Sequence, residues 1–132
     1  MKKYVLGIAF SIIVLSSCAG VEPMDSSRNT QSTKTIQKDL SAQEFNANVS
    51  KGLLLDVRTS EEFSEGNISG SQNLNIYGAN FSSELDKLDK NVPVYVYCKS
   101  GVRSSNASNM MKEKGFKEVN NLKGGYSSYP FK

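Results

Sequence analysis

The segment Asn91–Lys114, which reads NVPVYVYCKSGVRSSNASNMMKEK, constrains the fold of this chain more than any other part of it. Its first residues, Val92–Tyr97, are mostly β-branched or aromatic and predict a short buried strand. A helix is expected from Ser104 onward, with Gly115 as the residue that ends it. The residues between these elements must then form a tight loop that carries the chain from a strand directly into a helix.

The loop Cys98–Arg103 is a candidate anion site. Unpaired backbone N–H groups converge where a strand enters a helix through a tight loop, and these groups and the helix dipole favour a thiolate at Cys98. Arg103 and Lys99 add positive charge. The chain contains no histidine, so the loop itself must activate the thiol. A lone cysteine after a strand is often only a small buried residue, but the glycine, serines and arginine beside Cys98 favour a reactive one.

The chain from residue 34 onward alternates predicted strands and helices. The expected strands are Lys34–Gln37, Leu53–Val57, Asn73–Ile76, Val92–Tyr97 and Glu118–Leu122. Two expected helices start at capping boxes, Ser41–Glu44 and Thr59–Glu62. A third is expected to be capped by Ser82 or Ser83, and two more are expected to start at Ser104 and Gly125. This alternation predicts an open α/β sheet with helices on both faces. Ligands bind beyond the carboxyl ends of the strands in such sheets, so Cys98 and Asp56–Arg58 are expected at one rim.

Four motifs occur in a fixed order along the chain: LLLDVR at Leu53–Arg58, GNISGSQNL at Gly66–Leu74, CKSGVRS from Cys98, and LKGGY at Leu122–Tyr126. Together they resemble the motifs of the rhodanese-like sulfurtransferases. The second motif departs at three positions from the Gly-His-Ile-Pro-Gly-Ala of many members. The resemblance covers residues 34–132 and implies a rhodanese-like domain with an open, mainly parallel five-stranded sheet.

The resemblance also implies a two-step sulfur transfer. The Cys98 thiolate takes the outer sulfur of a donor such as thiosulfate, and the resulting persulfide passes it to a thiol or to cyanide. Cys98 and Arg103 are the expected catalytic residues, with Arg103 clamping the donor's sulfonate at an exposed rim or supporting the loop. The expected substrate-binding residues are Lys99, Ser100, Gly101, Val102 and Ser104. No cofactor and no metal are expected.

Asp56 and Arg58 are expected to hold the rim from behind the residues that touch substrate. Asp56 is interpreted as a cap of the neighbouring backbone, and Arg58 as a partner of Asp56 or of Glu62. Two other functions remain open for the chain. One is a non-catalytic rhodanese-like module that binds a partner or senses sulfur. The other is a cysteine-based phosphatase or arsenate reductase, although such loops place five residues between cysteine and arginine and this chain has four.

Residues 1–17 predict a lipoprotein signal peptide. Lys2 and Lys3 precede the apolar run Val5–Leu15, which is too short to span a bilayer. The run ends in LSSC, which resembles a bacterial lipobox, so Cys18 is expected to be acylated. The protein would then be anchored in the cell envelope outside the cytoplasm. Ala19 stands where an aspartate retains many lipoproteins at the inner membrane, which favours the outer membrane, facing the periplasm.

Residues 18–33 predict a flexible tether, because polar residues dominate and few apolar ones are present. Without its signal peptide the chain carries 14 basic and 13 acidic residues, a net charge near +1. Since no basic stripe is interleaved with aromatic residues, nucleic-acid binding is not expected. The expected partners are a small-molecule sulfur donor, a thiol or cyanide acceptor, and a membrane through the lipid anchor, with the protein as a monomer.

Overall fold

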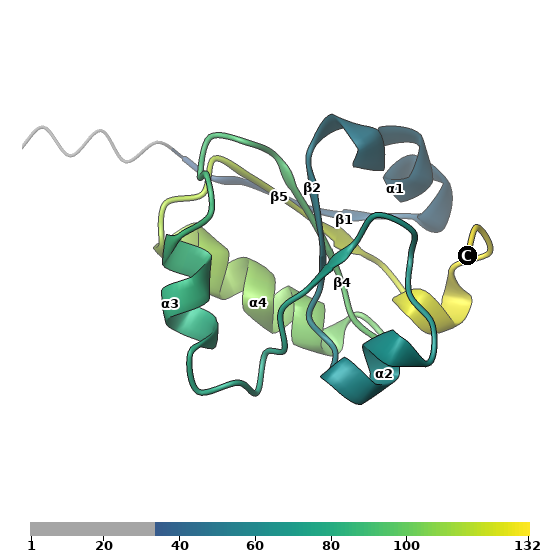
Figure 1. Cartoon of the computed structure of the whole chain (residues 1–132). Coiled ribbons are helices and arrows are strands. Elements are labelled where there is room, and N and C mark those ends of the chain that lie inside the picture. Colours follow the sequence, from purple (N-terminus) through teal and green to yellow (C-terminus); the bar gives the residue numbers. More distant parts are fainter. Residues whose placement is uncertain (1–33) are drawn as a thin grey trace, which may run out of the picture. The chain divides into compact units, whose positions relative to one another are not determined.

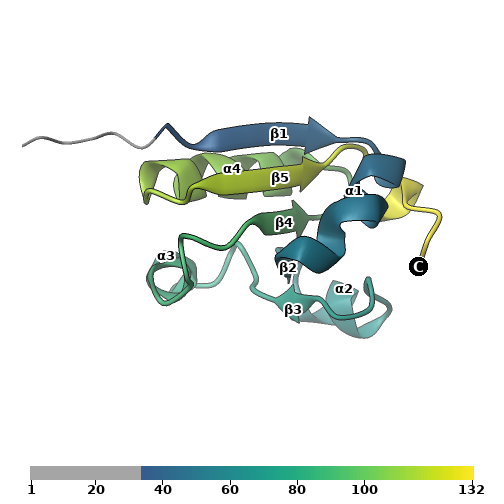
Figure 2. The same ribbon diagram turned by 90° about the horizontal axis from the view of Figure 1, so that it is seen from above.

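The computed structural model describes residues 34–132 of the chain. These residues are arranged around a sheet of five parallel strands (Figure 1). The strands are β1 Ile36–Leu40, β2 Leu53–Asp56, β3 Gln72–Asn73, β4 Val94–Tyr97 and β5 Glu118–Leu122. They lie in the order β1-β5-β4-β2-β3, and every neighbouring pair is parallel. Figure 2 shows this order along the sheet, with β1 and β3 at its edges. The prediction of an open parallel sheet of five strands is confirmed.

Helices cover both faces of the sheet, as predicted. They are α1 Ala42–Asn48, α2 Ser60–Ser64, α3 Phe81–Asp86 and α4 Val102–Glu113, with short 3₁₀ turns η1 at Val49–Lys51 and η2 at Tyr126–Ser128. Figure 1 shows α1 on one face, with α3 and α4 on the other. No helix among residues 34–132 is long and apolar enough to cross a membrane.

Strand β4 divides its side chains between two hydrophobic clusters. Val94, Val96 and then Cys98 belong to the cluster under α3 and α4, which also holds Leu55, Val57, Phe81, Leu85, Ala107, Met111, Phe116 and Val119. Tyr95 and Tyr97 belong to the cluster under α1 and η2, with Phe45, Leu54, Ile68, Leu122 and Tyr129. Successive side chains of a strand point to opposite faces, so this alternation sends Cys98 toward α4.

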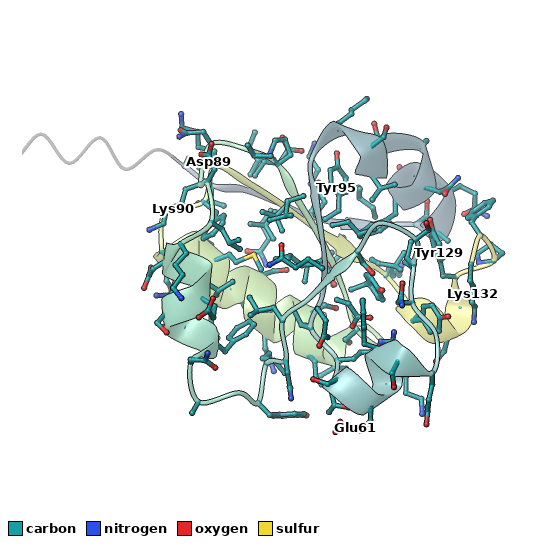
Figure 3. The ribbon with its side chains drawn as sticks, viewed as in Figure 1. Glu61, Asp89, Lys90, Tyr95, Tyr129 and Lys132 are labelled. Carbon is teal, nitrogen blue, oxygen red and sulfur yellow. The ribbon has the colours of Figure 1, made fainter. Side chains whose placement is uncertain are left out.

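Aromatic rings fill the cluster under α1. The ring of Phe45 meets Tyr95 at 5.6 Å and Tyr129 at 6.1 Å between centroids, edge to face in both cases. Tyr95 and Tyr129 are labelled in Figure 3, and the Tyr129 hydroxyl donates to the Asn46 side chain at 2.8 Å. Tyr95 and Tyr129 are therefore packing residues of this cluster.

Both predicted capping boxes are present. The Glu44 N–H donates to the Ser41 hydroxyl at 3.3 Å, and the Glu44 carboxylate accepts from the Ser41 N–H at 3.0 Å. The Glu62 N–H donates in the same way to the Thr59 hydroxyl at 3.3 Å, and its carboxylate accepts from the Thr59 N–H at 3.1 Å. Gly115 also follows α4 as predicted, with a φ of 84°.

The start of α3 was predicted wrongly. Asn80 is its N-cap, without a side-chain cap hydrogen bond, and Ser82 and Ser83 lie inside the first turn. The helix starts at Phe81, whose ring is buried, so packing rather than capping sets its position. Helix α4 likewise begins two residues before the predicted Ser104.

Four strands have different bounds from those predicted. Strand β2 ends at Asp56 rather than Val57, and β4 begins at Val94 rather than Val92. Strand β1 runs over Ile36–Leu40 rather than Lys34–Gln37, because its partner is β5 and the pairing extends from Ile36 with Glu118 to Leu40 with Leu122. Strand β3 is only Gln72–Asn73, which precedes most of the predicted Asn73–Ile76. The predicted signal peptide 1–17, the acylation site Cys18 and the tether 18–33 lie outside the described residues.

We expect the Met111→Ala substitution to lower the free energy of unfolding by about 2–5 kcal/mol, because it removes a fully buried side chain from the α3–α4 cluster. Met110→Ala is the matched control, since Met110 is only partly buried against the same cluster. Its loss should be clearly smaller. Denaturant titration of both variants measures the difference, and equal losses would contradict the assignment of Met111 to the core.

Candidate active site

The ends of β2 and β4 meet at the carboxyl edge of the sheet. Asp56 is in register with Tyr97, and the Val57 N–H donates to the Tyr97 carbonyl at 3.0 Å. Because the two strands are parallel neighbours, the residues that follow them emerge side by side. The structure therefore places Cys98 and the Asp56–Arg58 segment at one rim, as the sequence predicts.

Cys98 is a fully buried free thiol at the base of the loop. Its Sγ accepts a hydrogen bond from the Gly101 N–H at 3.0 Å and lies 3.5 Å from the Ser104 hydroxyl. That hydroxyl also lies 3.1 Å from the Gly101 carbonyl. The Ser104 hydroxyl has one proton to donate, and a charged Cys98 thiolate is a stronger acceptor than the Gly101 carbonyl. Ionisation of Cys98 therefore draws the Ser104 hydroxyl toward the sulfur.

The pKa of Cys98 reflects two opposing effects. Burial favours the neutral thiol and raises its pKa. Hydrogen bonds from the Ser104 hydroxyl and from the N–H groups of Ser104, Gly101 and Ser100 outweigh burial and leave the pKa below its ordinary value. The groups that lower this pKa all belong to the loop and the first turn of α4.

The loop turns into α4 at Gly101. This residue is the N-cap and has a φ of 101°, a left-handed conformation that favours glycine. The conformation points its N–H back at Cys98 and allows the helix to start at Val102. Lys99, Ser100 and Val102 are exposed on the crown of the loop, where a ligand would meet them first.

The segment after β5 supports the loop from behind. The Tyr126 N–H donates to the Cys98 carbonyl at 2.7 Å, and the Ser127 N–H donates to the Lys99 carbonyl at 3.0 Å. A Cβ on Gly125 would lie 2.5 Å from the carbonyl carbon of Lys99, so a side chain there would push the loop away. In the sequence, Leu122–Tyr126 was identified only as one of the family motifs, and its contact with the loop was not predicted. Its paired glycines after a buried strand were the available signal for a close backbone contact.

Asp56 and Arg58 form a buried ion pair, which confirms one of the two partners predicted for Arg58. The Asp56 carboxylate accepts from Arg58 Nη2 at 2.6 Å and Nε at 3.0 Å, and from the Arg58 backbone N–H at 2.9 Å. Arg58 Nη2 also donates to the Gly66 carbonyl at 2.7 Å. The guanidinium lies 4.3 Å from the ring centroid of Tyr126. Asp56 and Arg58 are thus bound to each other and to neighbouring groups at the rim.

Arg103 is bound by Glu62 rather than free at an exposed rim. Its Nη1 and Nη2 donate to the two carboxylate oxygens of Glu62 at 2.7 and 2.8 Å. Hydrogen bonds from Arg103 lower the pKa of Glu62 to about 2. Glu62 in turn raises the pKa of Arg103, and the nearby Cys98 thiolate adds to this effect. Sequence reasoning placed Glu62 in a capping box and as an alternative partner of Arg58, and it missed this contact.

A cavity of about 260 Å³ opens beside the loop. It is lined by Arg58, Glu62, Glu65, Gly66, Lys99, Tyr126, Ser127 and Lys132. The Lys132 ammonium, labelled in Figure 3, lies 4.4 Å from the ring centroid of Tyr126. No cluster of three or more His, Cys, Asp or Glu residues that could hold a metal occurs within 34–132. The site thus combines a buried, hydrogen-bonded sulfur with a small cavity of mixed charge.

Comparisons with known proteins agree with this architecture. The sequence model of the rhodanese-like domain matches residues 41–130. The chain is 35% identical over 94 residues to the protein YqhL of Bacillus subtilis, covering 71% of this chain and 73% of YqhL. It is 34% identical over 76 residues to the thiosulfate sulfurtransferase GlpE of Shewanella oneidensis, covering 58% of this chain and 73% of GlpE.

The fold has a close counterpart among solved structures. The crystal structure of a rhodanese-related protein from Thermoplasma volcanium superposes with a TM-score of 0.63 at 26% sequence identity, covering 70% of this chain and 89% of that one. The match of the domain model spans most of the sequence and includes both β2 and the Cys98 loop. On these grounds, together with the parallel sheet and the cysteine loop at its carboxyl edge, the chain belongs to the rhodanese-like family.

Proposed function

We propose that the protein is a sulfurtransferase that moves a sulfane sulfur from a donor such as thiosulfate to a thiol or to cyanide. The observation that carries this proposal is the hydrogen bonding of Cys98 Sγ by Gly101 and Ser104, which lowers the thiol pKa in a chain without histidine. The similarity to GlpE, a thiosulfate sulfurtransferase, supports the same reaction class.

In the first step, the Cys98 thiolate attacks the outer sulfur of thiosulfate. A Cys98 S–S bond forms, the bond between the two thiosulfate sulfur atoms breaks, and sulfite leaves with the electron pair. In the second step, an acceptor thiolate or cyanide attacks the terminal persulfide sulfur. The products are an acceptor persulfide or thiocyanate, and the Cys98 thiolate is regenerated. Each step exchanges one bond to sulfur, so no cofactor is required.

The loop supplies hydrogen-bond donors to the persulfide. Backbone N–H groups between Lys99 and Ser104 stabilise the terminal sulfur anion that forms in the first step. Lys99 and Ser100 are exposed on the crown and are proposed to meet donor and acceptor. Arg103 is proposed to support the loop, because Glu62 already binds both of its terminal nitrogens.

One observation favours a different function, a non-catalytic module that binds a partner or senses sulfur. Cys98 has no exposed surface in this conformation, and a donor must open the crown of the loop to reach it. The phosphatase alternative is disfavoured by the occupied guanidinium of Arg103, since an oxyanion held whole in such a loop needs that group.

Intact mass spectrometry after incubation with thiosulfate should show a gain of about 32 Da, one sulfur atom, as expected for a covalent intermediate. Cys98→Ser should abolish both the adduct and the turnover with cyanide. Ser105→Ala is the control, because Ser105 lies on α4 without a hydrogen bond to Cys98. A wild-type protein that reacts with iodoacetamide at Cys98 yet forms no adduct would support the binding module instead.

The rate of alkylation of Cys98 should rise with pH around a midpoint below about 8.5, the reference pKa of a cysteine thiol. Ser104→Ala should raise this midpoint, because it removes the hydroxyl that stabilises the thiolate. Ser105→Ala should leave the midpoint unchanged. If the midpoint of the wild type lies at or above the reference value, the loop does not activate the thiol.

We also propose that acylation of Cys18 anchors the protein in the cell envelope, at the outer membrane facing the periplasm. The LSSC motif after a basic and then apolar segment supports this. Two or more acyl chains anchor a protein stably, whereas one chain binds only marginally.

In fractionated cells, Cys18→Ala should move the protein out of the membrane fraction. Cys98→Ala should leave it there, which controls for the loss of a cysteine as such. Retention of the Cys18→Ala protein in the membrane fraction would contradict the anchor.

A further inference from the structure

The salt bridge between Glu62 and Arg103 joins two elements across the mouth of the site. Glu62 lies on α2 and Arg103 is the second residue of α4. Both terminal nitrogens of the guanidinium are used, each by one carboxylate oxygen, at 2.7 and 2.8 Å. This is the paired geometry in which arginine binds planar oxyanions. The carboxylate of Glu62 therefore occupies the face that a substrate oxyanion would need.

The position of Glu62 is fixed independently of Arg103. Its carboxylate also accepts the Thr59 N–H at 3.1 Å, as part of the capping box of α2. The Arg103 guanidinium lies 5.9 Å from the ring centroid of Tyr77 on its other side. Both partners are largely shielded, with 19% of the Arg103 side chain and 26% of the Glu62 side chain exposed. An incoming anion would have to displace a carboxylate that is already held in place.

The other cations near the site do not replace Arg103. Arg58 is bound by the Asp56 carboxylate and the Gly66 carbonyl. Lys99 and Lys132 line the cavity beside the loop, but Glu62 and Glu65 line it as well. A dianion entering this cavity meets two carboxylates together with two lysines, so the cavity offers it little net attraction.

We propose that Glu62 is a specificity-determining residue, because its carboxylate occupies the guanidinium of Arg103. Donors that carry an oxyanion next to the reacting sulfur, such as thiosulfate, are thereby disfavoured relative to organic persulfides. The proposal rests on the proposed sulfurtransferase function and narrows its donor class. With a persulfide donor R–S–SH, the Cys98 thiolate attacks the outer sulfur and the Cys98 S–S bond forms. The donor S–S bond breaks and R–S⁻ leaves. No oxyanion enters or leaves the loop in this reaction.

The test compares thiosulfate with glutathione persulfide as donors for the wild type and for Glu62→Gln. Glutamine keeps an oxygen for the capping box but removes the charge that holds Arg103. We expect kcat/KM for thiosulfate to rise at least tenfold, equivalent to about 1.4 kcal/mol, and kcat/KM for the persulfide not to rise. Glu61→Gln is the matched control, because Glu61 is the exposed neighbour on α2, as labelled in Figure 3. It should change neither value.

An unchanged or lower kcat/KM for thiosulfate in Glu62→Gln would overturn the proposal, as would an equal rise for both donors. Transfer from neither donor would instead overturn the proposed function. In that case the role of Glu62 can still be measured without turnover. The measured quantity is the concentration of sulfate needed to protect Cys98 from alkylation by iodoacetamide. Sulfate should protect Glu62→Gln at concentrations at least tenfold lower than it needs for the wild type. The double variant Glu62→Gln with Arg103→Gln should lose this gain. Equal protection of wild type and Glu62→Gln would overturn the proposal by itself.

Discussion

Two hydrogen bonds from the chain after β5 determine the shape of the active-site loop. Tyr126 and Ser127 bind the carbonyl oxygens of Cys98 and Lys99. The peptide unit is planar and trans, so a carbonyl fixed on one side leaves the following N–H on the opposite side. The Lys99 carbonyl and the Ser100 N–H belong to one such unit, and the Ser100 N–H is one of the groups that stabilise the Cys98 thiolate. The donors around the sulfur are thus oriented by bonds on the far side of the loop.

The Asp56–Arg58 motif acts on the loop through the same segment. The Arg58 guanidinium lies against the ring of Tyr126, whose backbone N–H holds the Cys98 carbonyl. Tyr126 in turn stacks against Tyr97, the last residue of β4, at 6.0 Å between ring centroids. A Cβ on Gly66 would lie 2.8 Å from the Tyr126 hydroxyl, so Gly66 also belongs to this packing. Three motifs separated in sequence therefore pack around one turn of backbone.

What could be predicted from the sequence is what depends on near neighbours in the chain. The capping boxes at Ser41 and Thr59, and the alternating faces of β4, follow from residues within a few positions of one another. The alternation of strands and helices predicts the open parallel sheet, but not the order of its strands. The partner of Arg103 is 41 positions away. In the sequence, Glu62 already had two local interpretations, as a capping residue and as an alternative partner of Arg58, and nothing in its spacing indicates Arg103. The contact of Gly125 with the loop and the packing of Phe81 likewise depend on the assembled tertiary structure.

Burial of the sulfur and its activation depend on each other. Removing a thiolate from water is costly, and burial alone would keep Cys98 protonated. The same exclusion of water strengthens each hydrogen bond that Gly101 and Ser104 make to the sulfur. In the proposed transfer, formation of a persulfide would move the negative charge outward from Cys98 Sγ by one S–S bond of about 2.05 Å. The charge then leaves the base of the loop and approaches the exposed crown at Lys99 and Ser100, where an acceptor can reach it. Burial of Cys98 is therefore compatible with the second step of the proposed transfer, because the sulfur that the acceptor would attack lies beyond Cys98 Sγ. The first step still requires the donor to open the crown of the loop, since Cys98 itself has no exposed surface.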